Sequence, residues 1–499
     1  MNFGSFINEF SDSEVLRPQA GLEIGNVTSD ARKVIPGALF VAYQGVSVDG
    51  HTYIEEAIRR GAVAIIAEHP VMVGVPQIVV SDGRAALSRA VALFWGHPSQ
   101  KFPVYGVTGT NGKSTIHWLL YHLFESLIGT TLRIGTLGVY SPDIPAHTGP
   151  TTTPTAEELH ELFALFRDHG GECVVMEVSS HGLAQHRVSD IAFRGAIFSN
   201  LSIDHLNFHE NLEDYFAAKC LLFSHLEREA VRIRKKLPAI VCIDDLHGVR
   251  LLESLSRESL SVLGYGESPE ADVRVSQFCQ SESGSEFSLS WQGRTYSVQS
   301  SLIGRYNALN IAAAFGMAVA QGFDPLEVCK LIKACPHVPG RLEPVVGEGK
   351  IVFVDYAHTG DGLRNALQAV REVCRGKLWC AFGCGGGKDP RKRANMGAAA
   401  KEFADCVVLT DDNPKDEDPA DIVKEILQSG VQPVFVEHDR ARAIRRTIAE
   451  MNSGDVFLLA GKGHEDYQIV QGVTHHFSDI EEVRAAFSER GVSESRESL

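Results

Sequence analysis

An apolar strand that runs directly into a glycine-rich loop constrains this chain more than any other feature. Val104–Val107 is a short apolar segment, residues 109–114 (Gly-Thr-Asn-Gly-Lys-Ser) follow it, and a helix is expected over Thr115–Leu127. Glycines let backbone N–H groups point inward and a helix start favours negative charge, so this order of elements binds nucleotide phosphates. We expect Lys113 to reach the terminal phosphates and Ser114 to place its hydroxyl on Mg²⁺. The candidate nucleotide-binding residues here are Gly109, Thr110, Asn111, Gly112, Lys113, Ser114 and Thr115.

The loop departs from the strict eight-residue phosphate-loop motif at the first position of that motif. Val107 stands where the motif has glycine. A glycine turn before an ordinary helix is therefore the structural alternative, although the Gly-Lys-Ser-Thr ending after an apolar strand favours phosphate binding. By itself the loop predicts only that the chain binds a nucleotide.

Length and charge narrow the remaining classes of protein. The chain has 499 residues, too many for one core, and this length suggests about three domains. Its formal net charge of −16 disfavours nucleic acid as a partner, because binding a phosphate backbone requires a surplus of lysine and arginine. No stretch reaches the ~18 consecutive apolar residues of a membrane span, and no secretory signal is recognisable. The ten cysteines form no C-x-x-C pair, so we expect neither a zinc site nor a disulfide framework. Together these observations predict a cytoplasmic protein without membrane insertion.

Turn-rich segments divide the chain into three parts. Residues 96–99 (Gly-His-Pro-Ser) and 335–340 (Cys-Pro-His-Val-Pro-Gly) interrupt the regular patterns, so we expect domains over residues 1–99, 100–337 and 338–499. Apolar runs alternate with helical patterns, which predicts an α/β fold; in the third part this is the pattern of a doubly wound sheet with sites at the strand C-terminal ends. Strands are expected at Ala38–Ala42, Ala62–Ala67, Cys173–Val178, Ala196–Ser199, Ala239–Ile243, Ile351–Val354, Leu378–Phe382, Cys406–Leu409 and Val456–Leu459.

Two side chains downstream of the loop are candidate metal ligands. Glu177 lies near the C-terminal end of the strand Cys173–Val178, and an acid in that place beside a phosphate loop commonly holds the metal ion. His205 is a second candidate ligand, although a lone histidine is more often structural.

Lys219 is unusual because its spacing places it on an apolar helix face. It follows Tyr215 by four residues and Phe216 by three, on a helix that Asn211 is placed to cap. Burying an ammonium is costly unless it is paired or neutralised. The amine could reach water while its stem packs. Alternatively, burial would favour the uncharged amine, which could take up CO₂ as a carbamate and become an anionic metal ligand. The spacing alone leaves both readings open.

Taken together, these residues resemble the Mur ligase superfamily, whose members couple ATP cleavage to amide bond formation. The resemblance extends from about Val27 to about Gln468 and is closest to the branch that adds the third amino acid. It implies three domains: an N-terminal UDP-binding α/β domain, a central phosphate-loop ATPase-like domain with a parallel sheet, and a C-terminal Rossmann-like domain that binds the amino acid. The motifs that carry it are residues 176–183 (Met-Glu-Val-Ser-Ser-His-Gly-Leu), 185–188 (Gln-His-Arg-Val), 200–206 (Asn-Leu-Ser-Ile-Asp-His-Leu), 215–219 (Tyr-Phe-Ala-Ala-Lys) and 411–414 (Asp-Asp-Asn-Pro).

The resemblance assigns a role to each group of residues. Lys219 matches the carbamylated lysine of the family, whose CO₂-derived carbamate helps hold a second Mg²⁺ together with His205 and Glu177. The implied cofactors are ATP and two Mg²⁺ ions, the implied metal ligands are Ser114, Glu177, His205 and Lys219, and the implied catalytic residues are Lys113, Glu177, His205 and Lys219. Positions that match binding of the UDP-muramoyl-dipeptide are Thr151, Thr152, Thr153, Ser179, Gln185 and Arg187. Positions that match ATP binding outside the loop are Asn307, Asn310, Arg341 and Asp355.

The added amino acid is read from the C-terminal part. Members that add diaminopimelate usually carry two arginines where this chain has Lys388 and Lys415. Both remain cationic and could pair with a distal carboxylate, although lysine offers a point charge rather than a bidentate fork. Glu465 would accept the second ammonium, which diaminopimelate and lysine share. Two cations that could pair with a distal carboxylate favour meso-diaminopimelate over lysine, because the lysine side chain has no carboxylate. The positions that match amino-acid binding are Lys388, Asp412, Asn413, Pro414, Lys415, Gly461 and Glu465.

The similarity implies a specific reaction of peptidoglycan biosynthesis. The γ-phosphoryl group of ATP would pass to the D-glutamate carboxylate of UDP-MurNAc-L-Ala-D-Glu, and the amine of meso-diaminopimelate would attack the acyl phosphate. The alternatives are addition of L-lysine, the related folylpolyglutamate synthase, which lacks a UDP domain of the Val27–Gly50 type, and a catalytically silent nucleotide-binding scaffold subunit. The intact candidate catalytic residues argue against a silent subunit, and we expect a monomer.

Overall fold

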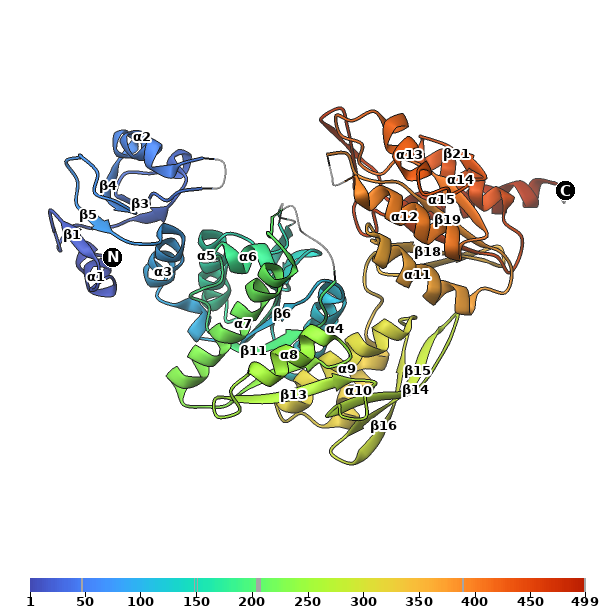
Figure 1. Cartoon of the computed structure of the whole chain (residues 1–499), viewed down its shortest axis with the longest axis horizontal. Helices are drawn as coiled ribbons and strands as arrows, with labels where there is room; N and C mark the ends of the chain where they lie inside the picture. Colours follow the sequence, from blue (N-terminus) through green and yellow to red (C-terminus); the bar gives the residue numbers. More distant parts are fainter. Residues whose placement is uncertain (46–47, 148, 150, 203–207, 388–389, 498–499) are drawn as a thin grey trace. The chain divides into compact units, whose positions relative to one another are not determined.

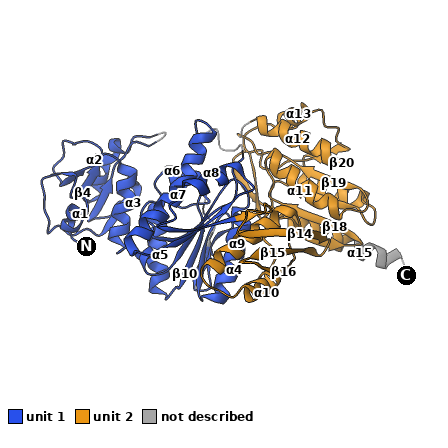
Figure 2. Cartoon of the chain, turned by 60° about the horizontal axis from the view of Figure 1, so that its bottom comes forward, with its two compact units in different colours: residues 1–264 blue, residues 265–499 orange. Residues whose placement is uncertain are grey.

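The computed structural model describes residues 1–497 apart from 46–47, 148, 150, 203–207 and 388–389. Two residues of the predicted site, His205 and Lys388, therefore lie outside the described residues. The chain forms two compact units, residues 1–264 and 265–499, hereafter unit 1 and unit 2 (Figure 2). Among the described residues we find no helix with both the length and the apolar character that crossing a bilayer requires.

Unit 1 begins with a sheet whose strand order is β1-β5-β4-β3-β2 (Figure 1). These strands pair in parallel, except that β1 is antiparallel to β5. Burial of nearly every residue of β3 and β4 explains why both were recognisable as apolar runs. The elements are α1 (Phe3–Glu9), β1 (Glu14–Leu16), β2 (Asn26–Thr28), η1 (Ala31–Lys33), β3 (Ala38–Val41), η2 (Gly50–Tyr53), α2 (Ile54–Arg60), β4 (Ala62–Ala67), β5 (Gln77–Val79) and α3 (Gly83–Phe94).

The central sheet of unit 1 carries the glycine-rich loop. The part of this sheet that belongs to unit 1 has the strand order β13-β12-β11-β6-β10-β7-β8-β9. Strand β6 lies between β10 and β11 and is parallel to both, so the carboxyl ends of these three strands meet at one edge. The elements are η3 (Pro98–Gln100), β6 (Val104–Thr108), α4 (Lys113–Leu127), β7 (Thr131–Gly135), β8 (Gly138–Ser141), β9 (Ile144–His147), α5 (Ala156–Asp168), β10 (Cys173–Glu177), α6 (Ser180–Ala184), β11 (Phe193–Phe198), α7 (Leu212–Ile233), β12 (Leu237–Cys242), α8 (Leu246–Ser254) and β13 (Leu260–Gly266).

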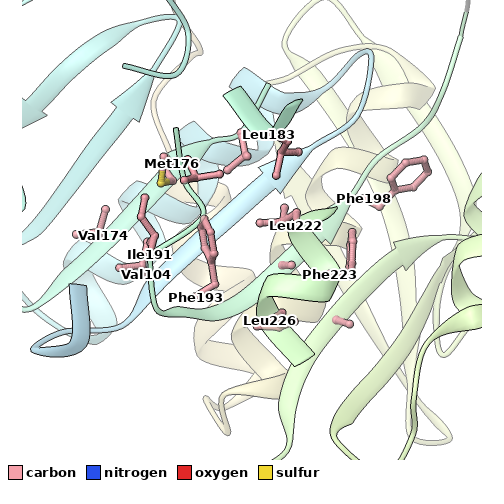
Figure 3. Packing of buried hydrophobic residues seen from close by; sticks show 14 of the residues in the cluster. Val104, Val174, Met176, Leu183, Ile191, Phe193, Phe198, Leu222, Phe223 and Leu226 are labelled. Carbon is pink, nitrogen blue, oxygen red and sulfur yellow. The ribbon is translucent and has the colours of Figure 1, made fainter. Parts of the chain in front are cut away.

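Helix α7 packs its apolar face on the central strands. Leu222, Phe223 and Leu226 of this helix lie against a cluster that includes Phe193 of β11 (Figure 3). The Asn211 side chain caps the helix by accepting a hydrogen bond from the backbone N–H of Asp214, as its sequence position indicates. The apolar face predicted from spacing is therefore the face that packs on the sheet.

Unit 2 contains an antiparallel meander followed by a doubly wound sheet. The meander strands β14, β15 and β16 pair in sequence order. The second sheet has the order β17-β18-β22-β19-β20-β21, and all of its pairs are parallel except β17 with β18. The elements are β14 (Val273–Ser281), β15 (Gly284–Trp291), β16 (Arg294–Ser300), α9 (Arg305–Ala320), α10 (Pro325–Ala334), β17 (Glu343–Gly347), β18 (Lys350–Asp355), α11 (Gly360–Val373), β19 (Leu378–Phe382), α12 (Arg391–Phe403), β20 (Cys406–Leu409), α13 (Pro419–Leu427), β21 (Phe435–Val436), α14 (Arg440–Glu450), β22 (Val456–Ala460), β23 (Tyr467–Val470), β24 (Val473–His476) and α15 (Asp479–Glu497).

Alternate residues of the doubly wound sheet belong to two different cores. Phe353 and Leu458 face a cluster built with α11, α12 and α13, whereas Val354 and Leu459 face a cluster built with α14 and α15. Helices therefore cover both faces, which explains why the strands read as continuous apolar runs rather than as alternating patterns. The predicted α/β class and the doubly wound C-terminal sheet are confirmed.

The predicted strands and the helix after the loop are present, with ends that coincide or differ by up to three residues. Three separate α/β blocks each have a sheet, in agreement with the three domains that the sequence indicates. The domain limits at residues 99 and 337 remain a prediction, because the two compact units divide the chain at residue 264 instead.

One consequence of the packing in unit 1 is a histidine buried without a polar partner. His160 on α5 is 0% exposed, and neither of its ring nitrogens has a hydrogen-bond partner among the described residues. Burial lowers the pKa of His160 from its ordinary value of 6.5 to about 3. Below about pH 6.5 the unfolded chain therefore binds a proton that the folded chain does not, and stability falls as the pH falls.

We predict that His160→Leu makes unfolding less sensitive to acid. A single such histidine costs about 1.4 kcal/mol of unfolding free energy for each pH unit below its ordinary pKa, so the variant should lose about that much slope. Urea unfolding followed by fluorescence between about pH 5 and pH 7 measures the slope. His169→Leu is the matched control, because His169 is exposed on the turn that ends the same helix. Equal slopes in the wild type and His160→Leu would contradict the prediction.

Candidate active site

The glycine-rich loop is shaped by two backbone conformations that favour glycine. Gly109 has a φ of +145° and Gly112 a φ of +85°. A Cβ atom at Gly109 would also lie 1.9 Å from the hydroxyl oxygen of Ser199. Helix α4 begins at Lys113 directly after the loop, so its first N–H groups face the space that the loop encloses. The strand–loop–helix order predicted from the sequence is confirmed.

Residues at the end of β11 hold the loop in place. The Asn200 side-chain oxygen accepts a hydrogen bond from the N–H of Asn111 at 2.9 Å, and the Asn200 amide donates to the carbonyl of Asn111 at 3.1 Å. The backbone carbonyl of Asn200 accepts from the N–H of Thr110 at 2.8 Å. Asn200 thus satisfies loop groups on several sides and holds the loop in this conformation.

Two lysine amines converge on one carbonyl oxygen of the loop. Lys113 Nζ donates to the carbonyl of Gly109 at 3.0 Å and to that of Thr110 at 2.8 Å. Lys219 Nζ donates to the same Gly109 carbonyl at 2.8 Å and lies 4.3 Å from the ring centroid of Tyr215. Lys219 is only 1% exposed, so its amine does not reach water as the snorkelling alternative requires. Two amines held this close make the loop suited to an anionic ligand.

Glu177 is a carboxylate buried completely at the end of β10. It accepts hydrogen bonds from the hydroxyl of Ser114 at 3.1 Å and from the N–H of Thr136 at 2.9 Å. The ring of His117 is 3.9 Å away, but burial lowers the pKa of His117 to about 4, so this ring is neutral near pH 7. Carboxylate and hydroxyl oxygens are donors that suit Mg²⁺, and Glu177 and Ser114 therefore fit such an ion. Among the described residues no three His, Cys, Asp or Glu side chains form a ready-made metal cluster.

The residues predicted to bind the UDP-linked acceptor come together next to Glu177. Thr153 Oγ1 lies 3.1 Å from the hydroxyl of Ser179 and donates to the backbone carbonyl of Glu177 at 3.1 Å. Arg187 donates to the carbonyl of Thr153 at 2.6 Å and to the side-chain oxygen of Gln185 at 2.7 Å. These contacts join two segments far apart in the sequence into one polar surface. The remaining two predicted residues directly precede Thr153; they are Thr151 and Thr152.

Four predicted nucleotide-binding residues lie in unit 2. Asn307 and Asn310 are buried one helical turn apart on α9, and the Asn310 amide donates to the side-chain oxygen of Asn307 at 3.0 Å. Asp355 accepts from the N–H of Leu342 and from that of Ala357, each at 2.8 Å. Burial raises the pKa of this carboxyl, and the neighbouring charge of Arg341 opposes the rise.

The C-terminal ends of β20 and β22 carry the predicted amino-acid residues. The Asn413 amide donates to Glu465 Oε2 at 2.9 Å, which joins the two segments directly. Gly461 has a φ of +115°, and a Cβ there would lie 2.4 Å from Asp412 Oδ2. Lys415 has a φ of +56° and exchanges backbone hydrogen bonds with the β23–β24 hairpin. A Cβ at Gly386 would lie 1.9 Å from the carbonyl of Pro414, so the glycine-rich loop after β19 packs against this segment.

Three family models match successive parts of the chain. They are described as "Mur ligase family, catalytic domain" over residues 23–95, "Mur ligase middle domain" over residues 107–318, and "Mur ligase, glutamate ligase domain" over residues 340–463. A relative from Aquifex aeolicus is 38% identical over 463 residues, covering 92% of this chain and 93% of its own length. The chain belongs to the Mur ligase family.

The similar proteins share a printed name. The Aquifex aeolicus protein and a Geobacter metallireducens protein, which is 40% identical over 94% of this chain and 95% of its own length, are both UDP-N-acetylmuramoyl-L-alanyl-D-glutamate–2,6-diaminopimelate ligases. A solved structure of a ligase with this name is 31% identical and covers 98% of this Mur ligase and 99% of its own chain, with a TM-score of 0.72.

Glu157 is a contact residue of this Mur ligase that sequence reasoning missed. It is in the first turn of α5, where an acid is an ordinary feature of a helix start. Its carboxylate accepts from the hydroxyl of Thr28 at 2.9 Å and from the N–H of Ser29 at 2.8 Å, and burial raises its pKa. It therefore ties the end of β2 to the helix that follows the threonine segment 151–153, a link between distant segments that no local pattern signals.

Two buried cations that the sequence did not single out hold the segments predicted to bind the amino acid. Lys462 is 0% exposed, and its amine lies 3.2 Å from both Asn413 Oδ1 and Glu465 Oε2. Arg440 forms a fully buried pair with Asp479 and also donates to the carbonyl of Ala460 at 2.9 Å. The sequence did not indicate that these two residues are buried, because most lysines and arginines lie at the surface.

We predict that Lys462→Met destabilises unit 2 by about 3 kcal/mol, because it leaves Glu465 partly buried without its cationic partner. Adding Glu465→Gln in the same chain should recover part of that loss, since the uncompensated charge is then removed. Urea unfolding measures both effects. Lys424→Met on α13 is the control, because Lys424 is exposed and its loss should change stability by less than about 0.5 kcal/mol. A stability of Lys462→Met equal to that of the control would contradict the prediction.

Proposed function

We propose that this Mur ligase joins diaminopimelate to the D-glutamate carboxylate of UDP-N-acetylmuramoyl-L-alanyl-D-glutamate, with cleavage of ATP to ADP and phosphate. The observation that carries the proposal is identity of 38–40% across more than nine-tenths of the chain to relatives that bear the name of this activity. The phosphate loop, the buried carboxylate beside it and the acceptor residues around Thr153 support it, since they bring a nucleotide site next to a second polar site.

The reaction needs activation of a carboxylate, which is a poor electrophile. The γ-phosphoryl group of ATP passes to a carboxylate oxygen, ADP leaves, and an acyl phosphate forms. The amine of diaminopimelate then attacks the carbonyl carbon, phosphate leaves with the C–O bond electrons, and the amine proton passes to solvent. Charge stabilisation is the main catalytic need of phosphoryl transfer. We assign this role to Lys113, and the hydrogen bonds of its amine to the loop carbonyls support the assignment.

Mg²⁺, when bound, would offset the negative charge of the phosphates. Ser114 and Glu177 are the described residues that would hold it, and His205 is proposed to hold a second Mg²⁺ together with Glu177. Lys219 would contribute to the second ion as a carbamate, formed when its uncharged amine adds to CO₂ and releases a proton. Its burial beside Gly109 supports this reading, because the amine is enclosed at the loop rather than directed into solvent.

The amino-acid specificity rests on charge at the C-terminal end of the site. Glu465 would accept the distal ammonium, and Lys415 and Lys388 would face the distal carboxylate, with Asp412, Asn413, Pro414 and Gly461 shaping the site. The contact between Asn413 and Glu465 supports this assignment, because it places the acid beside the segment that carries Lys415. L-lysine has no distal carboxylate, so it would leave these cations without a partner.

The proposed activity predicts phosphate release from ATP that depends on both partners. With UDP-N-acetylmuramoyl-L-alanyl-D-glutamate present, diaminopimelate should support turnover, whereas lysine and ornithine should support at least about tenfold less, since a lost buried ion pair costs more than about 1.4 kcal/mol. A coupled phosphate assay with each amino acid in turn measures this. Equal turnover with lysine would overturn the specificity, and absence of turnover with every amino acid would favour the silent scaffold subunit.

The proposed carbamate predicts that Lys219→Ala and Lys219→Arg both nearly abolish turnover, because neither side chain can add CO₂. Bicarbonate should partly rescue Lys219→Ala, in which the deleted side chain leaves space for the anion, and should not rescue Lys219→Arg. A second readout is independent of turnover: ¹³C NMR of the protein in ¹³C-bicarbonate should give a carbamate signal in the wild type and none in either variant. Full activity of Lys219→Ala without bicarbonate would contradict the carbamate role.

A further inference from the structure

Thr136 makes contacts on both sides of Glu177 that no part of the proposed reaction has used. It directly follows β7, and its backbone N–H donates to Glu177 Oε1 at 2.9 Å while its hydroxyl donates to Glu177 Oε2 at 3.1 Å. One residue therefore binds both oxygens of a carboxylate that is 0% exposed. The same hydroxyl oxygen lies 3.1 Å from the hydroxyl oxygen of Thr152.

Strand pairing explains why Thr136 can approach so closely. Strand β7 is parallel to β10, with Ile134 opposite Met176. The next residue is Gly135, where a Cβ would lie only 2.5 Å from Glu177 Oε1. Since Gly135 has no side chain, the backbone can turn over the carboxylate and direct the N–H of Thr136 onto it. The contact is thus built into the sheet.

The chemistry of the groups fixes the direction of each hydrogen bond. An ionised carboxylate only accepts, so the single proton of the Thr136 hydroxyl points to Glu177. The Thr136 oxygen then accepts from the Thr152 hydroxyl, because it has no second proton to donate. On the other side, the Ser114 hydroxyl donates to Glu177 Oε2. The donated hydrogen bonds therefore converge on Glu177, from Thr152 through Thr136 and separately from Ser114.

The two ends of this chain belong to different ligand sites. Ser114 is in the phosphate loop, and Thr152 is in the segment proposed to bind the UDP-linked acceptor. We propose that Thr136 is a positioning residue that couples nucleotide binding to acceptor binding. The inference rests on the proposed function for the identity of the acceptor. Thr136 is the described residue that contacts both Glu177 and Thr152 through one hydroxyl. A ligand that moves either Glu177 or Thr152 therefore acts on the orientation of the same hydroxyl group.

The expected coupling is positive, so that each ligand strengthens binding of the other. With nucleotide and Mg²⁺ bound, Ser114 and Glu177 would be held in place, and the Thr136 hydroxyl that donates to Glu177 would be held with them. Thr152 is then already ordered when the acceptor binds, so the second ligand loses less conformational entropy than it would alone. Linkage requires the reciprocal effect: the acceptor must raise nucleotide affinity by the same factor.

The test is calorimetric titration of the full-length protein with the UDP-dipeptide, in the absence and presence of Mg²⁺ and ADP. For the wild type we expect the acceptor to bind at least about fivefold more tightly with the nucleotide present, the lower end of typical coupling between sites. Thr136→Val removes the hydroxyl but keeps the backbone N–H and the side-chain shape, and it should reduce this factor to about one. Thr136→Ser restores the hydroxyl and should restore the factor.

A matched control separates coupling from a general loss of one buried hydroxyl. Thr447 in unit 2 is 0% exposed and donates its hydroxyl to the carbonyl of Ala443 at 2.8 Å, so Thr447→Val should keep the wild-type factor. If Thr136→Val does not fold, Thr152→Val breaks the same contact from its other end, and the ratio of the two affinities remains the readout.

The outcomes distinguish this inference from the proposed function. A wild type that binds nucleotide but shows no acceptor binding would contradict the proposed function. A wild type that binds both ligands without mutual effect, or a Thr136→Val variant with the wild-type factor, would overturn the coupling role while leaving the proposed function intact.

Discussion

The constraint on which unit 1 depends is a charged group buried at the end of a parallel strand. Glu177 is 0% exposed, so its two oxygens must be satisfied by groups that the surrounding strands deliver. The order β11-β6-β10-β7 brings the phosphate loop to one side of the carboxylate and Thr136 to the other. The fold is therefore what allows a carboxylate to remain buried, and the carboxylate in turn fixes the separation of the loop from the threonine segment.

Unit 2 meets the same constraint with cations. Arg440 is fully buried, and it donates to Asp479 and to the backbone carbonyls that precede Asp412 and Gly461. The guanidinium thus holds together the ends of two neighbouring segments, and Lys462 does the same for the side chains of Asn413 and Glu465. Since paired buried charges require closely defined partners, these contacts define the geometry of the two segments they join.

Sequence reasoning reached the elements and the site residues that have local patterns. The apolar run before Gly109 is recognisable as a strand. The acid at the end of β10 and the lysine on the apolar face of α7 are polar residues that interrupt apolar patterns. All three are found where the spacing indicates. Thr136, Glu157 and Lys462 could not be found in this way. Their importance comes from partners at 16, 41, 49 or more than 120 residues away in the chain. Lys462 also pairs with Glu465 three residues away, but the local sequence does not reveal that Lys462 is buried.

The departure at Val107 shows how a mismatch to a motif can follow from the fold. Val107 is 0% exposed in the middle of the sheet, where it pairs with Glu177 of β10 and Ile197 of β11. The residue therefore belongs to the strand, and a glycine there would only weaken it. The conformations that need glycine occur two and five residues later, at Gly109 and Gly112. The glycine-rich turn in this Mur ligase therefore lies wholly after Val107, and Asn200 beyond the neighbouring strand supports it through two hydrogen bonds with Asn111.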